Sequence, residues 1–186
     1  MSEFIYGVAE NDITSPISDC PFYVKWFDMI RRSCSHDYKK RNPSYIGVTV
    51  CEEWLKFSNF KSWMKGCDWR DKELDKDLIH PHNKVYAPEN CCFIPHSLNT
   101  FMIQGRASKR GLPKGVTYHI QHKKFQARIS IDKSRVHLGY YNTVDEAHLA
   151  YRVVKIIELK RLRKLETDKR IRKGLKRHIK ILEIGV

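Results

Sequence analysis

The first half of the chain places apolar residues at helical spacing. Phe22, Trp26 and Ile30 recur every fourth residue and predict a helix with one buried face. Pro21 suits the first turn of this helix, and Asp19 is the expected N-cap.

A second helix is predicted from Glu52, with Trp54, Phe57, Phe60 and Met64 along its apolar stripe. A short strand is expected just before it, near residues 47–50. Another short helix is expected near residues 94–104, after the polar segment 74–92. Residues 1–18 show no period and are expected to form a loose arm.

The second half of the chain changes to a period of two. Residues 115–120, 125–131 and 135–141 alternate between apolar and polar side chains and are separated by turn signals, which predicts three short strands. One face of this sheet can pack, and the other is cationic and hydrogen-bonding. The polar face of the middle strand holds Lys124, Gln126, Arg128 and Ser130, and Arg135 and His137 follow on the third strand.

A helix should begin after the third strand, because Thr143 and Glu146 have the spacing of a capping box. Residues 155–186 carry 12 Lys and Arg against 4 Asp and Glu, which indicates a basic and helical tail. The apolar stripe expected to cover the sheet consists of Val144, Ala147, Ala150, Tyr151 and Val154.

Composition supports a folded protein that neither enters the secretory pathway nor spans a membrane. Of the 186 residues, 41% are hydrophobic and 11% aromatic, enough for a packed core. The first residues have no basic region followed by an apolar run, so no secretory signal is expected. No apolar run approaches the roughly 20 residues that a spanning helix needs.

The six cysteines are expected to be reduced and mostly buried, since no secreted context supports disulfides. A structural zinc ion is not expected. The alternative would be a site built from Cys34, Cys51 and Cys91, with His36 or His96 as the fourth ligand.

The distribution of charge suggests a polyanionic partner for the second half. Residues 1–100 carry 13 Lys and Arg against 14 Asp and Glu, and residues 101–186 carry 22 against 7. The net charge of +14 therefore comes entirely from the second half. Such asymmetry most often indicates nucleic acid; the bland alternative is a basic, well-solvated surface.

The basic sheet resembles the plant ethylene-response-factor (apetala-type) DNA-binding domain. The resemblance is carried by Gly115-Val116, by KFQARI at 124–129, by RVHLGYY at 135–141 and by residues 143–150. It implies that the outer sheet face contacts duplex DNA. A basic protein that binds RNA is the less favoured alternative. Carried over by position, the contact residues are Lys114, Thr117, His119, Lys124, Arg128, Ser130, Arg135 and His137.

The segment LDKDLIHPHNKVYAPENCC, residues 74–92, gathers oxygen and nitrogen donors in a loop-like stretch. Hydrolysis of a phosphodiester needs a divalent ion to polarise the phosphate and a base to activate water. Asp75 and Asn90 are the best pair of oxygen ligands for Mg²⁺ or Mn²⁺. Asn83 would brace the loop between them.

This segment also resembles the HNH (ββα-metal) motif in its phage homing-endonuclease form. Further carriers are WFDMIRRSC at 26–34, VCEEW at 50–54 and residues 57–63. The resemblance implies Asp75 and Asn90 as metal ligands and Asn83 as the central asparagine. It also implies a phage-encoded protein that acts in the cytoplasm of an infected bacterial host.

One position departs from the family. Its typical form has a histidine base directly after the acidic ligand, where this chain has Lys76, and a protonated lysine cannot take a proton. His80 or His82 would then supply the base, and Lys76 or the basic loop Lys39-Lys40-Arg41 would stabilise charge on the phosphate. A surface ion-pair cluster of Asp75, Lys76 and Asp77 is the alternative without chemistry.

The expected fold class is α+β, with an HNH-like helical region followed by a three-stranded antiparallel sheet on one helix. The expected function is a metal-dependent DNA endonuclease, and the alternative is a catalytically degenerate HNH-fold protein that binds DNA as a regulatory or architectural factor. The expected divisions are an arm at 1–18, a nuclease region at 19–104, a linker at 105–112, a DNA-binding domain at 113–154 and a tail at 155–186.

Overall fold

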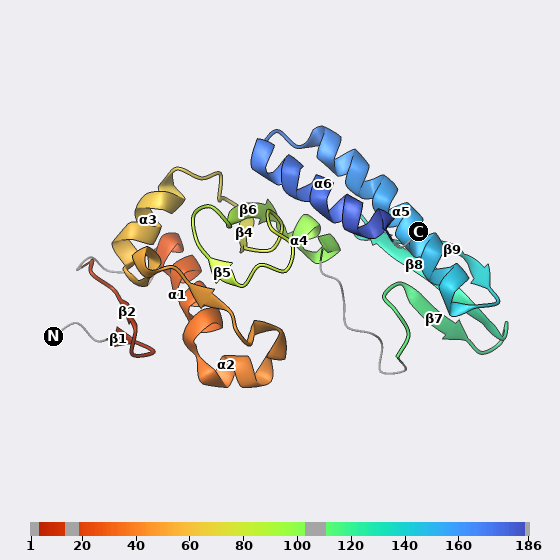
Figure 1. Cartoon of the computed structure of the whole chain (residues 1–186), viewed down its shortest axis with the longest axis horizontal. Coiled ribbons are helices and arrows are strands. Elements are labelled where there is room, and N and C mark those ends of the chain that lie inside the picture. The colour runs from red at the N-terminus through yellow and green to blue at the C-terminus, as the bar shows by residue number, and fades with distance from the viewer. Residues whose placement is uncertain (1–3, 14–18, 103–110, 185–186) are drawn as a thin grey trace. The chain divides into compact units, whose positions relative to one another are not determined.

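The computed structural model describes residues 4–13, 19–102 and 111–184, and it mixes helices with small sheets (Figure 1). The chain divides into two compact units, residues 1–94 and 95–186. The expected mixed α and β class is confirmed. No helix among the described residues is long and apolar enough to cross a membrane. Most of the expected linker, residues 105–112, lies outside the described ranges.

The first unit begins with a small hairpin of β1 (Phe4–Ile5) and β2 (Ala9–Glu10). Ala9 is fully buried in the core of this unit, and Asp12 accepts a hydrogen bond from the Ser58 amide at 2.8 Å. The expectation of a loose arm is therefore wrong for residues 4–13. Residues 1–3 and 14–18 lie outside the described part of the chain.

Helix α1 (Pro21–Cys34) starts with the expected proline, but Cys20 is its N-cap and no side chain caps it. The prediction of Asp19 as the cap is wrong. The cause is register, because the cap is the residue directly before Pro21 and Asp19 lies one position too early. The helix buries Trp26, Met29 and Ile30, the face that the sequence predicts.

The single helix expected from Glu52 is divided in two. A 3₁₀-helix η2 (Glu52–Leu55) precedes helix α3 (Phe57–Lys65), and Lys56 between them is extended with ψ 128°. Lys56 forms an isolated bridge to Glu10 of β2, a contact that a continuous helix would not allow. Despite this break, Trp54, Phe57 and Phe60 are all buried in one aromatic core.

The rest of the first unit surrounds the polar segment 74–92. Strand β3 (Thr49–Val50) pairs in parallel with β5 (Val85–Tyr86), and β4 (Lys72–Asp75) pairs with β6 (Cys92–Pro95). Helix α2 (His36–Arg41) and the 3₁₀-helix η1 (Pro43–Tyr45) lead from α1 to β3. These short pairings hold both ends of the polar loop.

The second unit contains the sheet β7–β8–β9, whose strands are Val116–His119, Lys124–Ile131 and Ser134–Tyr141. All its pairings are antiparallel. Helix α5 (Val144–Leu165) begins with the capping box of Thr143 and Glu146 and covers one face of the sheet. Its core there consists of Val116, Ala127 and Ala147.

Two further helices complete the second unit. Helix α4 (His96–Met102) is short, and α6 (Lys169–Glu183) runs back along α5 (Figure 1). Helix α5 continues through residue 155 to Leu165, so the basic tail does not begin as a separate element. Residues 166–168 separate α5 from α6, and Asp168 is the N-cap of α6.

Candidate functional site

The carboxylate of Asp75 closes the turn that follows β4. Its Oδ1 accepts hydrogen bonds from the backbone N–H groups of Asp77 at 2.9 Å and Leu78 at 2.6 Å. Within the described part of the chain, Oδ2 accepts none. Burial raises the pKa of Asp75, and the Leu78 amide opposes that shift. One oxygen is therefore structural, and the other can still bind a cation.

Lys76 is held inside the same loop. Its Nζ donates to both carboxylate oxygens of Asp77 at 2.7 Å and to the backbone oxygen of Asn83 at 3.0 Å. The residue is only 7% exposed. Its Nζ thus donates to all three acceptors, and a lysine ammonium group has no lone pair with which to take a proton from water.

Asn83 and Asn90 both turn toward Val85. The amide of Asn83 donates to Val85 O at 2.7 Å and to Lys76 O at 3.0 Å, and Asn90 donates to Val85 O at 3.3 Å. The structure therefore brings Lys76, Asn83 and Asn90 together across the loop. Because Asn90 uses its NH₂ group here, its Oδ1 remains the atom that can bind a cation.

His80 and His82 lie in the middle of the loop and are exposed. His82 adopts a left-handed backbone conformation with φ 65°. Among the described residues, no group of three or more His, Cys, Asp or Glu side chains could hold a metal ion. Mg²⁺ often uses only one or two carboxylates and keeps several waters, so Asp75 with Asn90 is an adequate donor pair in type.

The cysteines form no disulfide, and all six lie in the described ranges. Cys91 is fully buried, and burial raises the pKa of its thiol well above the usual range. Burial raises the pKa of Cys34 and Cys51 as well. All three are therefore thiols at neutral pH, which is the less favourable form for binding zinc.

The outer face of the β7–β8–β9 sheet gathers the polar residues that the alternation predicts. Thr117 pairs with Gln126, Arg128 with His137, and Ser130 with Arg135. Arg128 donates to Thr117 Oγ1 at 3.3 Å, and the Gln126 amide lies 3.0 Å from His137 Nδ1. His119 pairs with Lys124 at the end of the same face.

Tyr140 joins this face, although alternation alone places it on the inner side. Ala127 pairs with Gly139 and Arg128 with His137, so Leu138 is an extra residue in β9. This bulge turns both His137 and Tyr140 outward. The Tyr140 ring lies 4.4 Å from His122, 4.8 Å from His137 and 5.3 Å from His119 between ring centroids.

The sequence interpretation missed Tyr140 and His122. The available signal was Gly139, which has φ 132° and is typical of a strand irregularity. We call the outward side chains of Thr117, His119, His122, Lys124, Gln126, Arg128, Ser130, Arg135, His137 and Tyr140 the outer sheet face.

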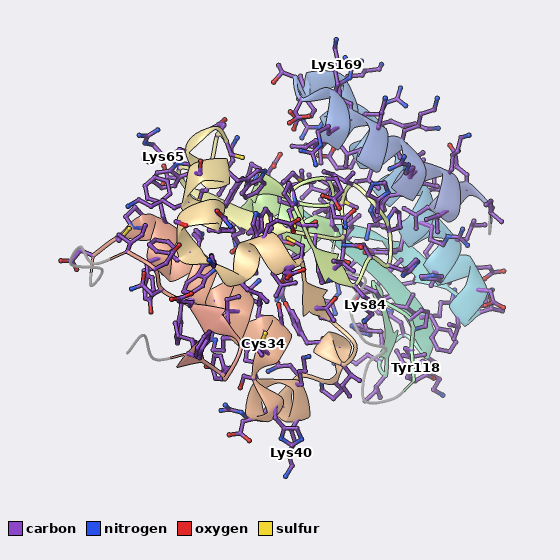
Figure 2. The ribbon with its side chains drawn as sticks, turned by 60° about the vertical axis from the view of Figure 1, so that its left-hand side comes forward. Cys34, Lys40, Lys65, Lys84, Tyr118 and Lys169 are labelled. Atoms are coloured by element: carbon purple, nitrogen blue, oxygen red, sulfur yellow. The ribbon has the colours of Figure 1, made fainter. Side chains whose placement is uncertain are left out.

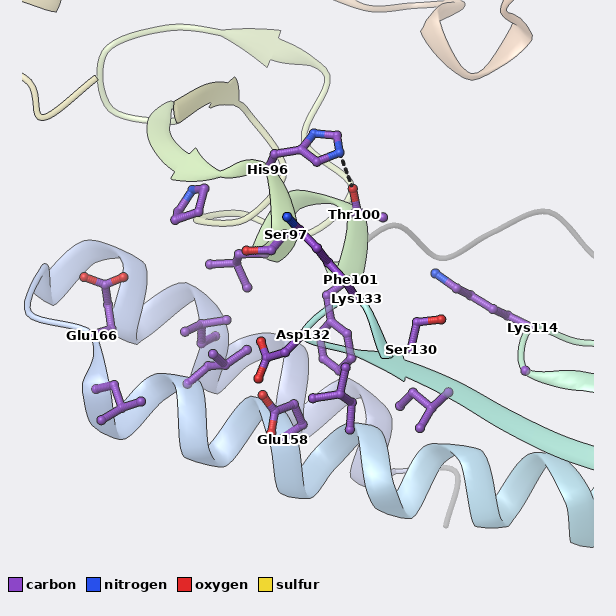
Figure 3. A pocket seen from close by; sticks show the side chains of 18 of the residues that line it. His96, Ser97, Thr100, Phe101, Lys114, Ser130, Asp132, Lys133, Glu158 and Glu166 are labelled. Carbon is purple, nitrogen blue, oxygen red and sulfur yellow. Dashed lines mark hydrogen bonds between the residues drawn. The ribbon is translucent and has the colours of Figure 1, made fainter. Parts of the chain in front are cut away.

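Lys114 lies before β7 and outside the strands. It lines a pocket of about 980 Å³ in the second unit, together with residues of α4, β8, α5 and α6 (Figure 3). Burial lowers the pKa of Lys114. The pocket wall carries both charge signs, with Glu158 and Asp132 beside Lys133, so its electrostatics favour no single ligand charge.

Lys155 of α5 is buried, at 3% exposure. Its Nζ lies 5.5 Å from the Phe101 ring centroid and 5.9 Å from that of Tyr151. Burial, with Lys114 as a second cause, lowers the pKa of Lys155 to about 8.

No protein-family model matches this chain, and neither a curated protein nor a solved structure does.

Proposed function

We propose that this protein binds duplex DNA through the outer sheet face, and that its first unit is a metal-dependent endonuclease region acting on the DNA. The observation that carries the binding is the composition of the outer sheet face. Helix α5 covers the opposite side of the sheet, so this is the side of the sheet from which a ligand can approach.

The chemistry of the outer sheet face suits the major groove of B-form DNA. That groove admits a β-surface, and arginine, glutamine and histidine can donate to base edges there. Arg135 and Lys124 are exposed and suit phosphate contacts. The major groove of A-form RNA is too deep and narrow for such a surface, which favours DNA over duplex RNA.

The proposed cleavage uses the polar loop of the first unit. Asp75 and Asn90 would hold Mg²⁺ or Mn²⁺, which polarises the phosphate when bound. His82 or His80 would take the proton from the attacking water. These roles follow the resemblance to the HNH motif, and the oxygens Oδ2 of Asp75 and Oδ1 of Asn90 are compatible with them.

A second candidate function is DNA binding without cleavage, and the bonding of Lys76 favours it. The position after Asp75 is where the resembled family places its base. In this protein that position is Lys76, whose Nζ donates hydrogen bonds to the Asp77 carboxylate and to Asn83 O. A chain that keeps the loop for stability and loses the base would bind DNA as a regulatory or architectural protein.

The experiment that separates the two candidates is cleavage of supercoiled plasmid and of phage or bacterial genomic DNA with Mg²⁺, Mn²⁺ or EDTA. The key variant is Asp75→Asn, because an amide oxygen still accepts from the Asp77 and Leu78 N–H groups. Since burial raises the pKa of Asp75, the folded protein favours the ionised form less than the unfolded chain does, and Asp75→Asn should keep or raise stability.

We expect metal-dependent nicking or cutting by the wild type and none by folded Asp75→Asn. Asp75→Ala is the structural comparison, because it removes both turn hydrogen bonds and should cost about 1–3 kcal/mol of folding free energy. Cleavage that survives in Asp75→Asn removes Asp75 from the metal site. Tight binding with no cleavage of any of these DNAs favours the second candidate.

Binding through the sheet is tested with Arg128→Gln/Arg135→Gln in a fluorescence anisotropy titration on labelled duplexes. Loss of two cations from the outer sheet face should reduce the salt slope of log Kd by about 2. The control Arg128→Lys/Arg135→Lys keeps the charge and should keep the slope. A Gln variant that binds with unchanged slope and affinity contradicts binding through this face.

A further inference from the structure

Helix α6 is strongly amphipathic, and its apolar side is already occupied. Ile171, Leu175 and Ile179 are buried, and α6 packs along α5. Gly174 is buried on the same side. Asp168 fixes the start of the helix by accepting from the N–H groups of Arg170 and Ile171.

The opposite side of α6 is cationic from one end to the other. At 100° per residue, five basic positions fall within an arc of about 100°, whose centre lies about 150° from Ile171 and about 110° from Leu175. Figure 2 shows Lys169 at the start of this helix with its side chain directed outward. The five residues, all exposed, form what we call the α6 stripe: Lys169, Arg172, Lys173, Lys176 and Lys180.

The α6 stripe lacks counter-charges. Among the described residues, none of the five forms an ion pair, and α6 has no acidic residue before Glu183. Two basic residues of α5 differ, because Arg161 pairs with Glu158 and Lys160 with Glu183.

Folding alone does not explain this arrangement. Lys169 and Lys173, and likewise Lys176 and Lys180, are like charges one turn apart, and each such pair destabilises a helix by about 0.2–0.5 kcal/mol. Lys169 also sits at the positive end of the helix dipole. A bound polyanion would relieve all of these repulsions at once.

We propose that the α6 stripe binds the phosphate backbone of duplex DNA as a second contact surface, distinct from the outer sheet face. The inference rests on the proposed DNA binding and extends it. From Lys169 to Lys180 the helix rises about 16 Å, and about five phosphates of one DNA strand occupy that axial length. Four of the five residues are lysines, point charges that suit phosphates better than base edges.

The buried apolar side decides between DNA and a membrane surface. A basic amphipathic helix that lies on anionic lipid must insert its apolar face into the bilayer. Here Ile171, Leu175 and Ile179 are packed within the second unit. The α6 stripe therefore presents positive charge without an exposed apolar face, and this suits the phosphates of DNA.

The test is the full-length variant Lys169→Gln/Lys173→Gln/Lys176→Gln/Lys180→Gln, with the four Lys→Arg substitutions as the matched control. Kd for two 30-base-pair duplexes of different sequence would be measured between 50 and 300 mM salt. About three lost phosphate contacts should reduce the salt slope by about 3 and weaken binding to both duplexes equally. The Arg variant should retain the wild-type slope.

Other outcomes would overturn either the proposed DNA binding or the role of the α6 stripe in it. A wild type that binds neither duplex refutes the proposed DNA binding itself. A wild type that binds, with a Gln variant whose slope is unchanged, refutes only the role of the α6 stripe. Tighter wild-type binding to vesicles of equal phosphatidylglycerol and phosphatidylcholine than to DNA, lost in the Gln variant, would assign the stripe to membranes. Far-UV circular dichroism should show undiminished helix in both variants.

Discussion

The contact between Gly115 and Tyr151 is a sensitive point of the second unit. Gly115 has φ +84°, and a Cβ added there would lie 2.1 Å from Cδ2 and 2.5 Å from Cγ of Tyr151. Tyr151 is 6% exposed, so its ring has little room to move. The Gly115 oxygen also accepts from the Arg128 N–H at 2.8 Å, which ties the start of β7 to β8.

Gly115→Ala should therefore destabilise the second unit by about 2–4 kcal/mol. The left-handed backbone costs an alanine about 1–2 kcal/mol, and forcing a methyl group into a packed ring costs about 1–3 kcal/mol. The lower entropy of the unfolded alanine chain offsets about 0.4–1 kcal/mol. The matched control is Gly47→Ala, since Gly47 has φ +77° and nothing within 4 Å of its added Cβ. That control should lose about 1 kcal/mol or less.

Urea unfolding can follow the two units separately, because all four tryptophans lie between residues 26 and 69. Tryptophan fluorescence therefore reports on residues 1–94, and circular dichroism at 222 nm also includes α5 and α6. At a slope of about 2 kcal/mol/M, Gly115→Ala should lower the dichroism midpoint by about 1–2 M and leave the fluorescence midpoint in place. A loss no larger than that of Gly47→Ala would refute the packing of Gly115 on Tyr151.

Two further substitutions test α5. Lys155→Met should raise stability by about 1–3 kcal/mol at pH 7, because the folded state holds the ammonium with its pKa lowered to about 8. Between pH 8 and 10.5 the folded protein releases this proton before the unfolded chain does, so the advantage of Met should shrink; a pH-independent difference in urea midpoints would contradict this account. Thr143→Ala should cost about 1 kcal/mol, because Thr143 Oγ1 accepts from the Glu146 N–H at 3.2 Å, and Thr143→Ser should retain most of it in a thermal melt.

Local periodicity predicts much of the second unit, because the direction of a side chain along a regular strand or helix depends only on spacing. The buried Ala127 and Ile129 and the capping box of Thr143 are such cases. Tyr140 is an exception. One extra residue at Leu138 reverses the alternation after it, and that bulge depends on pairing with β8.

In the first unit, two of the errors come from contacts distant in sequence. Lys56 is extended because it bridges Glu10, and Ala9 is buried because the hairpin before it folds onto the core. Residue types near Lys56 favour a continuous helix, and tertiary contacts override that preference. The same limit applies to the polar loop at residues 74–92. Residue types predict which side chains can donate or accept hydrogen bonds, but they do not predict the partners of those side chains.

The hydrogen bonds around Asp75 separate the two requirements of the proposed hydrolysis. Metal binding needs oxygens, and the loop uses one oxygen of Asp75 and the NH₂ of Asn90 for its own structure. Each of these residues therefore retains an oxygen for a cation, held in place by the bonds that the other atoms make. Activation of water needs a base with a lone pair near neutral pH. The Nζ of Lys76 instead donates hydrogen bonds to the Asp77 carboxylate and to Asn83 O. The proposed cleavage would thus need His80 or His82, whereas the proposed metal binding would not, and a folded Asp75→Asn variant tests the metal requirement by itself.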